Sequence, residues 1–247
     1  MRDLAAQQRE LADLVTGLGA DGWERPTPCP GWAVADVVLH LAQTDELAAA
    51  SASGRFPEEL ARLTAGLGAV RDVDEAAGRM VARDRAAGPA AIHDRWRRAA
   101  GALRAALRGR DPAARVRWVA GVLTARTLAT TRLAETWIHT CDVAEALGRP
   151  LAPSRRLHHV ARLAWRTIPY AFARAGRRPP GPVAFELTGP GGERWAWHPD
   201  GPARTTIRGD AFELCRVAAR RVDPARTALV GEGPDAAAVL ELVRTYA

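Results

Sequence analysis

The chain has 247 residues, of which 47% are hydrophobic and 26% are charged, a composition typical of a globular protein with one large domain or two modest ones. It contains no uninterrupted apolar run of about 18 residues, so we expect no membrane-spanning helix. The N-terminal stretch carries acids and lacks an apolar segment followed by a small-residue cleavage site, so we expect no signal peptide. Three scattered cysteines do not make a disulfide framework, and we therefore expect a cytoplasmic protein.

The net charge of +7 arises from 35 basic residues, all of them arginine, against 28 acids. Such a surplus is compatible with nucleic-acid binding. The arginines, however, are spread from Arg2 to Arg244 among acidic residues, without a basic arm, a zinc-finger spacing or a clear helix-turn-helix signature. We therefore expect neither nucleic acid nor a membrane as partner. Because guanidinium groups bind carboxylates and phosphates, a small anionic substrate is the partner that we expect instead.

The first 175 residues are typical of a helical domain. Leucines and valines at helical spacing predict a first helix that stops at Gly19, and a proline-rich loop follows over 23–32. Gly148, with Pro150 just beyond it, is typical of a helix C-terminus. Shorter helices are expected within the glycine-punctuated stretch 53–90, and longer helices are predicted over 33–50, 91–107, 124–147 and 154–175.

The composition changes at 176–182, where GRRPPGP has the character of a linker. The segment VAFELT at 183–188 alternates with period two, and residues 193–198 follow a glycine-rich turn as its partner strand. A third strand over 203–208 and helices over 210–221 and 234–246 complete the prediction. The chain is thus predicted to be mainly α, with a helical bundle over 1–175 and a small α+β domain over 183–247.

The stretch 132–147 reads RLAETWIHTCDVAEAL and carries the clearest chemical signal. Glu135 and His139 are four residues apart, so on a helix they project from one face about one turn apart. A carboxylate and an imidazole at this spacing can ligate one divalent metal ion, and a third ligand must then come from another helix. The best candidate is His40, which lies in the otherwise apolar segment 33–50. Two histidines and a glutamate form a known catalytic zinc set but also fit a non-haem iron triad.

These residues also have ordinary structural interpretations. A Glu-x-x-x-His pair on an exposed helix face is a solvated pair, and a histidine in an apolar helix is often a hydrogen-bonded core residue. The metal interpretation gains weight because both segments are predicted bundle helices, and bundle cores are where metal sites are built from facing side chains.

Two motifs in order carry a resemblance to a known family. PGWAVADVVLHL at 30–41 is followed, about a hundred residues later, by ETWIHTCDVAEAL at 135–147. With these motifs the chain resembles the DinB-like superfamily and, more closely, the actinobacterial mycothiol-dependent maleylpyruvate isomerase family. The resemblance extends to LTGPGGERWAW at 187–197. It implies a four-helix metal-binding bundle joined to a smaller α+β domain, with zinc as the expected metal and with the family's three ligands on His40, Glu135 and His139.

The chemistry that the resemblance implies is thiol chemistry. In such enzymes the metal binds the thiol of a low-molecular-weight cofactor, mycothiol in actinobacteria, and makes its thiolate accessible near neutral pH. Addition to an activated alkene, rotation and release gives cis–trans isomerisation, whereas a retained thiol gives S-transfer. We therefore expect a metal-dependent isomerase or thiol transferase, as a monomer or homodimer. Two alternatives remain: a thiol-independent lyase, cyclase or hydrolase of specialised metabolism, and a non-enzymatic metal-binding protein.

Five further residues are candidates around this centre. Arg132 precedes Glu135 by three positions and shares its helix face, and we expect it, with Asp45, to act in catalysis. Arg97 and Trp137 are expected to bind substrate. Asp142 lies three positions beyond His139 and is expected to orient its second ring nitrogen.

The cysteines are interpreted differently. Cys141 points about 200° away from His139 on a helix, which does not favour a nucleophilic role. Cys29, in the proline-rich loop, is interpreted as a small packed hydrophobe rather than a reactive thiol.

Overall fold

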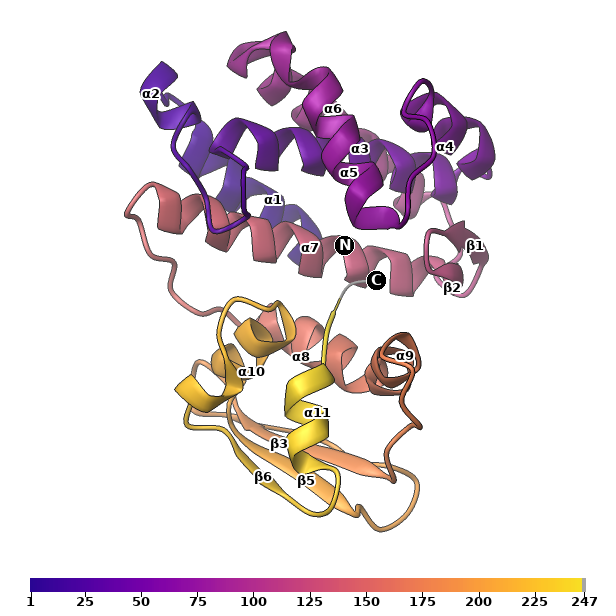
Figure 1. The fold of residues 1–247 in the computed structure, drawn as a ribbon, viewed down its shortest axis with the longest axis vertical. Coiled ribbons are helices and arrows are strands. Elements are labelled where there is room, and N and C mark those ends of the chain that lie inside the picture. Colours follow the sequence, from indigo (N-terminus) through magenta and orange to yellow (C-terminus); the bar gives the residue numbers. More distant parts are fainter. Residues whose placement is uncertain (246–247) are drawn as a thin grey trace. The chain divides into compact units, whose positions relative to one another are not determined.

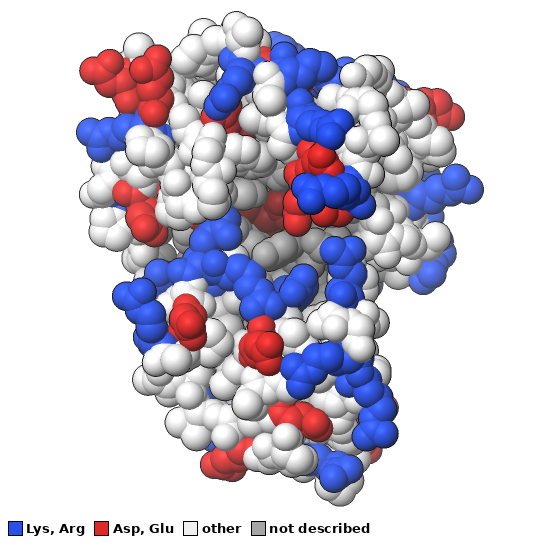
Figure 2. Space-filling model, viewed as in Figure 1, with Lys and Arg blue, Asp and Glu red and all other residues white. Residues whose placement is uncertain are grey.

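The computed structural model describes residues 1–245, which form two compact units, residues 1–151 and the chain from residue 152 onward. The chain is mainly helical, as predicted, and its C-terminal unit combines helices with a sheet. Within the described residues, no helix is long and apolar enough to cross a membrane. On the face drawn in Figure 2, arginines are spread widely and acidic residues lie among them.

The N-terminal unit is a bundle of four long helices, α1, α3, α6 and α7, of which α3 packs against α6 and α7, and α1 packs against α7 (Figure 1). Short helices and one hairpin connect them. The elements are α1 (Arg2–Val15), α2 (Ala20–Trp23), α3 (Val34–Ala52), α4 (Phe56–Thr64), α5 (Val73–Asp84), the 3-10 turn η1 (Arg85–Ala87), α6 (Pro89–Arg108), β1 (Arg115–Trp118), β2 (Gly121–Thr124) and α7 (Ala125–Ala146).

Helix α3 forms the centre of this unit. Val37, Val38 and Leu41 are fully buried, and most of the helix surface is covered by neighbours, as expected for a central helix that is apolar nearly all round. Helix α7 begins at Thr124, whose hydroxyl accepts a hydrogen bond from the backbone of Thr127. It is followed by Gly148 at φ +65°, the left-handed conformation that glycine adopts at low cost.

The helices predicted over 33–50, 91–107 and 124–147 are confirmed, with ends within two residues of those expected, whereas the first helix ends at Val15, before the expected Gly19. The hairpin β1–β2 was not predicted. Its first strand, RVRW, does alternate between exposed and covered side chains, but over four residues only, and its second strand, GVLT, has no buried residue.

The C-terminal unit contains a four-stranded sheet of order β4-β3-β5-β6, in which β3 and β5 are parallel and the outer pairs are antiparallel. Helices α8, α10 and α11 pack against its strands. The elements are α8 (Leu157–Arg166), α9 (Ile168–Arg174), β3 (Val183–Thr188), β4 (Arg194–Trp197), β5 (Thr205–Asp210), α10 (Ala211–Ala218), the 3-10 turn η2 (Pro224–Arg226), β6 (Val230–Glu232) and α11 (Ala236–Leu242).

The boundary between the units differs from the one expected. The sequence suggested a helical domain over 1–175, but the division falls after Leu151, and both α8 and α9 belong to the C-terminal unit. The apolar face of α8 packs on β3, β4 and α10, and the indole of Trp165 donates to the carbonyl of Val183 over 2.9 Å. Amphipathicity identified this helix but not the surface on which it packs.

Three details of the C-terminal unit also differ. The helix expected over 154–175 is broken at Thr167, where Pro169 begins a new helix with the ring in its first turn. Strand β6 is fully exposed and was not predicted. The last helix ends at Leu242, and residue 246 of the predicted range lies outside the described residues.

Candidate metal centre

His40 on α3 meets Glu135 and His139 on α7, as the sequence predicted. Oε1 of Glu135 lies 3.2 Å from Nε2 of His40 and 3.5 Å from Nε2 of His139. The three donor atoms lie within 4.8 Å of one another. The two imidazole rings stand nearly perpendicular, with centroids 5.1 Å apart. Two helices thus bring two nitrogen donors and one carboxylate to a common point.

The charges of this cluster are strongly coupled. Burial alone would raise the pKa of Glu135, but hydrogen bonds with His139 and His40 outweigh it and hold that pKa well below its usual value. Burial lowers the pKa of His40. Burial also acts to lower the pKa of His139, but hydrogen bonds to Asp142, Cys29 and Glu135 raise it well above its usual value. Both directions favour an ionised Glu135 beside a protonated His139 when no metal ion is bound.

Asp142 lies where it was predicted, behind His139. Its Oδ2 is 2.9 Å from Nδ1 of His139. Because the ring donates Nδ1–H to this buried carboxylate, Nε2 is the nitrogen that faces Glu135. His40 has no equivalent support, since its Nδ1 is buried without a hydrogen-bond partner among the described residues.

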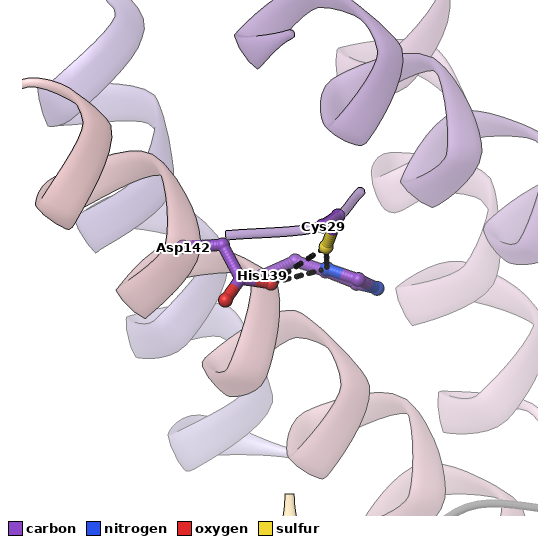
Figure 3. A group of neighbouring side chains, drawn as sticks. All are labelled: Cys29, His139 and Asp142. Carbon is purple, nitrogen blue, oxygen red and sulfur yellow. Dashed lines mark hydrogen bonds and ion pairs between the residues drawn. The ribbon is translucent and has the colours of Figure 1, made fainter. Parts of the chain in front are cut away.

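The sequence interpretation missed a role for Cys29. Its thiol donates a hydrogen bond to Oδ2 of Asp142 over 3.2 Å, and Sγ lies 3.8 Å from Nδ1 of His139 (Figure 3). The side chain also packs at the edge of the apolar core, as expected. Cysteine and carboxylate both contact the same ring nitrogen, whereas in a Cys–His–Asp catalytic triad they occupy opposite nitrogens. This geometry favours support of the ring over nucleophilic attack.

Trp32 was also missed as a residue of the site. Its ring centroid lies 5.1 Å from that of His40 and 6.5 Å from that of His139. The loop reaches this position through a tight turn, in which the amide of Trp32 donates to the carbonyl of Cys29 and Gly31 adopts φ +77°. The sequence could have indicated this role, because Trp32 lies in the same motif as His40, at 30–41.

The two residues expected to act in catalysis bind each other. Nε of Arg132 donates to Oδ1 of Asp45 over 2.9 Å, and the two side chains are 2% and 0% exposed. A second guanidinium nitrogen donates to the hydroxyl of Thr44. Burial raises the pKa of Asp45, although the positive charge of Arg132 opposes the shift. A fully enclosed ion pair of this kind favours a role in folding over contact with substrate.

The two residues expected to bind substrate lie elsewhere. Arg97 is exposed on α6, and among residues 1–245 no hydrogen bond or ion pair joins it to His40, Glu135 or His139. Trp137 is only 5% exposed. Neither environment favours contact with a molecule bound between the candidate ligands.

The match to a family model covers this whole arrangement. The model of the mycothiol maleylpyruvate isomerase N-terminal domain matches residues 4–144, which include the three candidate ligands, Asp142 and the loop of Cys29. The chain belongs to this family. The mycothiol maleylpyruvate isomerase domain therefore corresponds to the helical bundle of the N-terminal unit.

Similar proteins extend over the whole chain. Two relatives from strains of Mycobacterium tuberculosis, both named only as uncharacterised proteins, are each 33% identical over 246 residues, 99% of this chain and 94% of the relative. The crystal structure of mycothiol-dependent maleylpyruvate isomerase has the same fold, with a TM-score of 0.60 at 15% identity. The crystal structure of a histidine-to-alanine variant of that enzyme matches with a TM-score of 0.62 at 16% identity. Each comparison covers 95% of this chain and 93% of the other. The predicted family and fold class are thereby confirmed.

Proposed function

We propose that this protein is a metal-dependent enzyme that uses mycothiol to act on a small electrophilic molecule, as an isomerase or a thiol transferase. The observation that carries the proposal is the meeting of Nε2 of His40, Oε1 of Glu135 and Nε2 of His139 at one point. Family membership supports the thiol and the isomerase class.

The residues present fit a divalent cation. Two imidazole nitrogens and one carboxylate oxygen are a donor set suited to zinc, and three protein ligands leave room for a further ligand. Nε2 of His139 is already directed by the bond from Nδ1 to Asp142, which is how metal-binding histidines are commonly held. When bound, the cation supplies the Lewis acidity that keeps a cofactor thiol deprotonated near neutral pH.

The surrounding side chains have separate tasks in this proposal. The half-buried indole of Trp32 lies beside both histidine rings and gives the site an apolar side. Cys29 and Asp142 hold the ring of His139 from behind. Glu135 is the most accessible of the three ligands, with 23% of its side chain exposed, so a small molecule approaches from its side.

The reaction class follows from the thiol. Reversible thiol addition to an activated double bond turns that bond into a single bond, which rotates before the thiol leaves, and the net result is cis–trans isomerisation. If the thiol remains on carbon, the same addition becomes S-transfer. We also place this activity in the cytoplasm, where thiols are kept reduced, because three scattered cysteines do not make a disulfide framework.

The test is the thiol dependence of activity. The purified, zinc-loaded protein is assayed for isomerisation of maleylpyruvate, and for conjugation of an electrophilic alkene, with and without mycothiol. We expect turnover only with the thiol, and a rise in the melting temperature when mycothiol is added to the zinc form. Equal turnover without any thiol would contradict the proposal and support a metal-dependent lyase or hydrolase. Absence of both turnover and a thermal shift would support the non-enzymatic alternative.

A further inference from the structure

A hollow of about 800 Å³ lies on the N-terminal unit between α1 and α6. Its lining includes a single acid, Asp94, and none of the three candidate metal ligands. The arginines that line it come from both helices and are Arg9, Arg97, Arg98, Arg104 and Arg108, a group that we call the arginine hollow.

The five arginines of this hollow outnumber the one acid that lines it. Among residues 1–245, no ion pair joins any of its five arginines to a carboxylate, although arginines elsewhere in the same unit are paired. Arg79 and Arg95, for example, lie 2.6 Å from Glu75 and 2.7 Å from Glu46. Burial, the charge of Arg108 and the charge of Arg9 lower the pKa of Arg104, against the attraction of Asp45. Like charges held together in this way oppose folding unless an anion joins them.

One arginine of the hollow is held rigidly by the interior. A guanidinium nitrogen of Arg104 donates to Oε1 of Gln8, which is 3% exposed. The amide nitrogen of Gln8 in turn donates to Oδ2 of Asp45 over 3.3 Å, and Asp45 is bound to Arg132. The fork of Arg104 is therefore oriented by a buried network before any ligand arrives, which lowers the entropy cost of binding.

We propose that the arginine hollow binds a small polyanion, a molecule that carries at least two carboxylate or phosphate groups. Guanidinium groups bind such groups in paired hydrogen bonds, and several of them around one hollow suit several anionic groups on one ligand. The volume is that of an ordinary small-molecule site. The site does not depend on the proposed metal centre, since no candidate ligand lines it.

The test is calorimetric titration of the full chain with citrate and, separately, with inorganic tripolyphosphate at low salt. We expect saturable binding of about one molecule per chain. The double variant Arg97→Gln/Arg108→Gln, at two exposed residues, is expected to weaken it about tenfold or more, a change of about 1.4 kcal/mol or more. The matched control Arg71→Gln/Arg126→Gln removes two exposed arginines outside the hollow and is expected to change the affinity by less than about twofold.

The outcomes of the titrations distinguish between classes of ligand and an effect of net charge. Tighter binding of citrate indicates a polycarboxylate ligand and tighter binding of tripolyphosphate a phosphorylated one, and either supports the proposal. Absence of saturable binding of both anions overturns it. Equal weakening in the control variant also overturns it, because the effect would then be one of net charge. A short DNA duplex that binds more tightly than either anion, and loses affinity in the hollow variant, would reassign the surface to nucleic acid.

Discussion

Helices α3 and α7 carry two clusters of ionisable residues that look alike in the sequence and differ in construction. Asp45 and Arg132 are enclosed, and each charge is satisfied by the other and by neighbouring hydrogen bonds. His40, Glu135 and His139 share one carboxylate oxygen between two rings, and Glu135 remains accessible. In the first cluster both charges are neutralised without a ligand. In the second, the two imidazoles and the carboxylate can still bind a cation. This difference separates a pair that supports the fold from residues available for chemistry.

The largest expected effect is on stability, from breaking the buried pair. Arg132→Met leaves the carboxylate of Asp45 without its cation, and we expect a loss of about 3–5 kcal/mol in the free energy of unfolding. Urea denaturation measures it. The double variant Arg132→Met/Asp45→Leu is expected to be more stable than the single variant, because no buried charge is then left unpaired. A single variant within about 1 kcal/mol of wild type would show that the pair is not structural.

The next effect is on metal affinity, from the carboxylate behind His139. Asp142→Asn removes the charge that fixes the ring, and we expect zinc affinity to fall about 10–100-fold. A competition titration with a chromophoric chelator measures this. Unchanged zinc affinity in a folded variant would remove Asp142 from the site.

The affinity of the site for zinc should also depend on pH, in a direction set by the protonation of His139. Its pKa is raised well above the usual value in the absence of metal, so a cation must displace a proton from this ring. Zinc affinity is therefore expected to rise with pH, by up to about tenfold per unit, until the ring is neutral without metal. The same chelator titration from about pH 6 to 8 checks the sign. A flat or falling profile would contradict the protonated state of His139.

The smallest expected effect comes from Cys29. Cys29→Ala removes one donor from Asp142, and we expect zinc affinity to fall by less than in Asp142→Asn, about threefold to tenfold. Cys29→Ser keeps a donor and should restore most of the loss. Cys141→Ala is the matched control, since it removes another half-buried thiol, one that points away from His139 on the helix. An equal effect of both alanine variants would show that the contact with Asp142 is unimportant.

Helical spacing was enough to predict the main elements and the three candidate ligands. Glu135 and His139 share a helix face by their spacing, and His40 was conspicuous as a histidine within an apolar helix. The ion pair of Asp45 with Arg132 could not be predicted in this way, because spacing gives the face of a helix but not which side chain binds another across the bundle.

Most of the features that the sequence did not predict depend on contacts between distant segments of the chain. Cys29 meets Asp142 across 113 positions of the chain, through a loop whose path no periodicity encodes. The strands of the β1–β2 hairpin and β6 are only three or four residues long, and β2 and β6 contain no buried residue, so their sequence signal is weak. Helix α8 was recognised, but its packing partner, and with it the boundary after Leu151, depends on the shape of the sheet.

The most direct test of the metal centre is the metal content of the protein, measured by mass spectrometry after purification and dialysis against zinc-free buffer. The geometry of His40, Glu135 and His139 predicts about one equivalent of divalent metal in the wild type. It also predicts loss of that metal in a folded His40→Ala/His139→Ala variant. Less than about half an equivalent in the wild type, or undiminished metal in the double variant, would contradict the account.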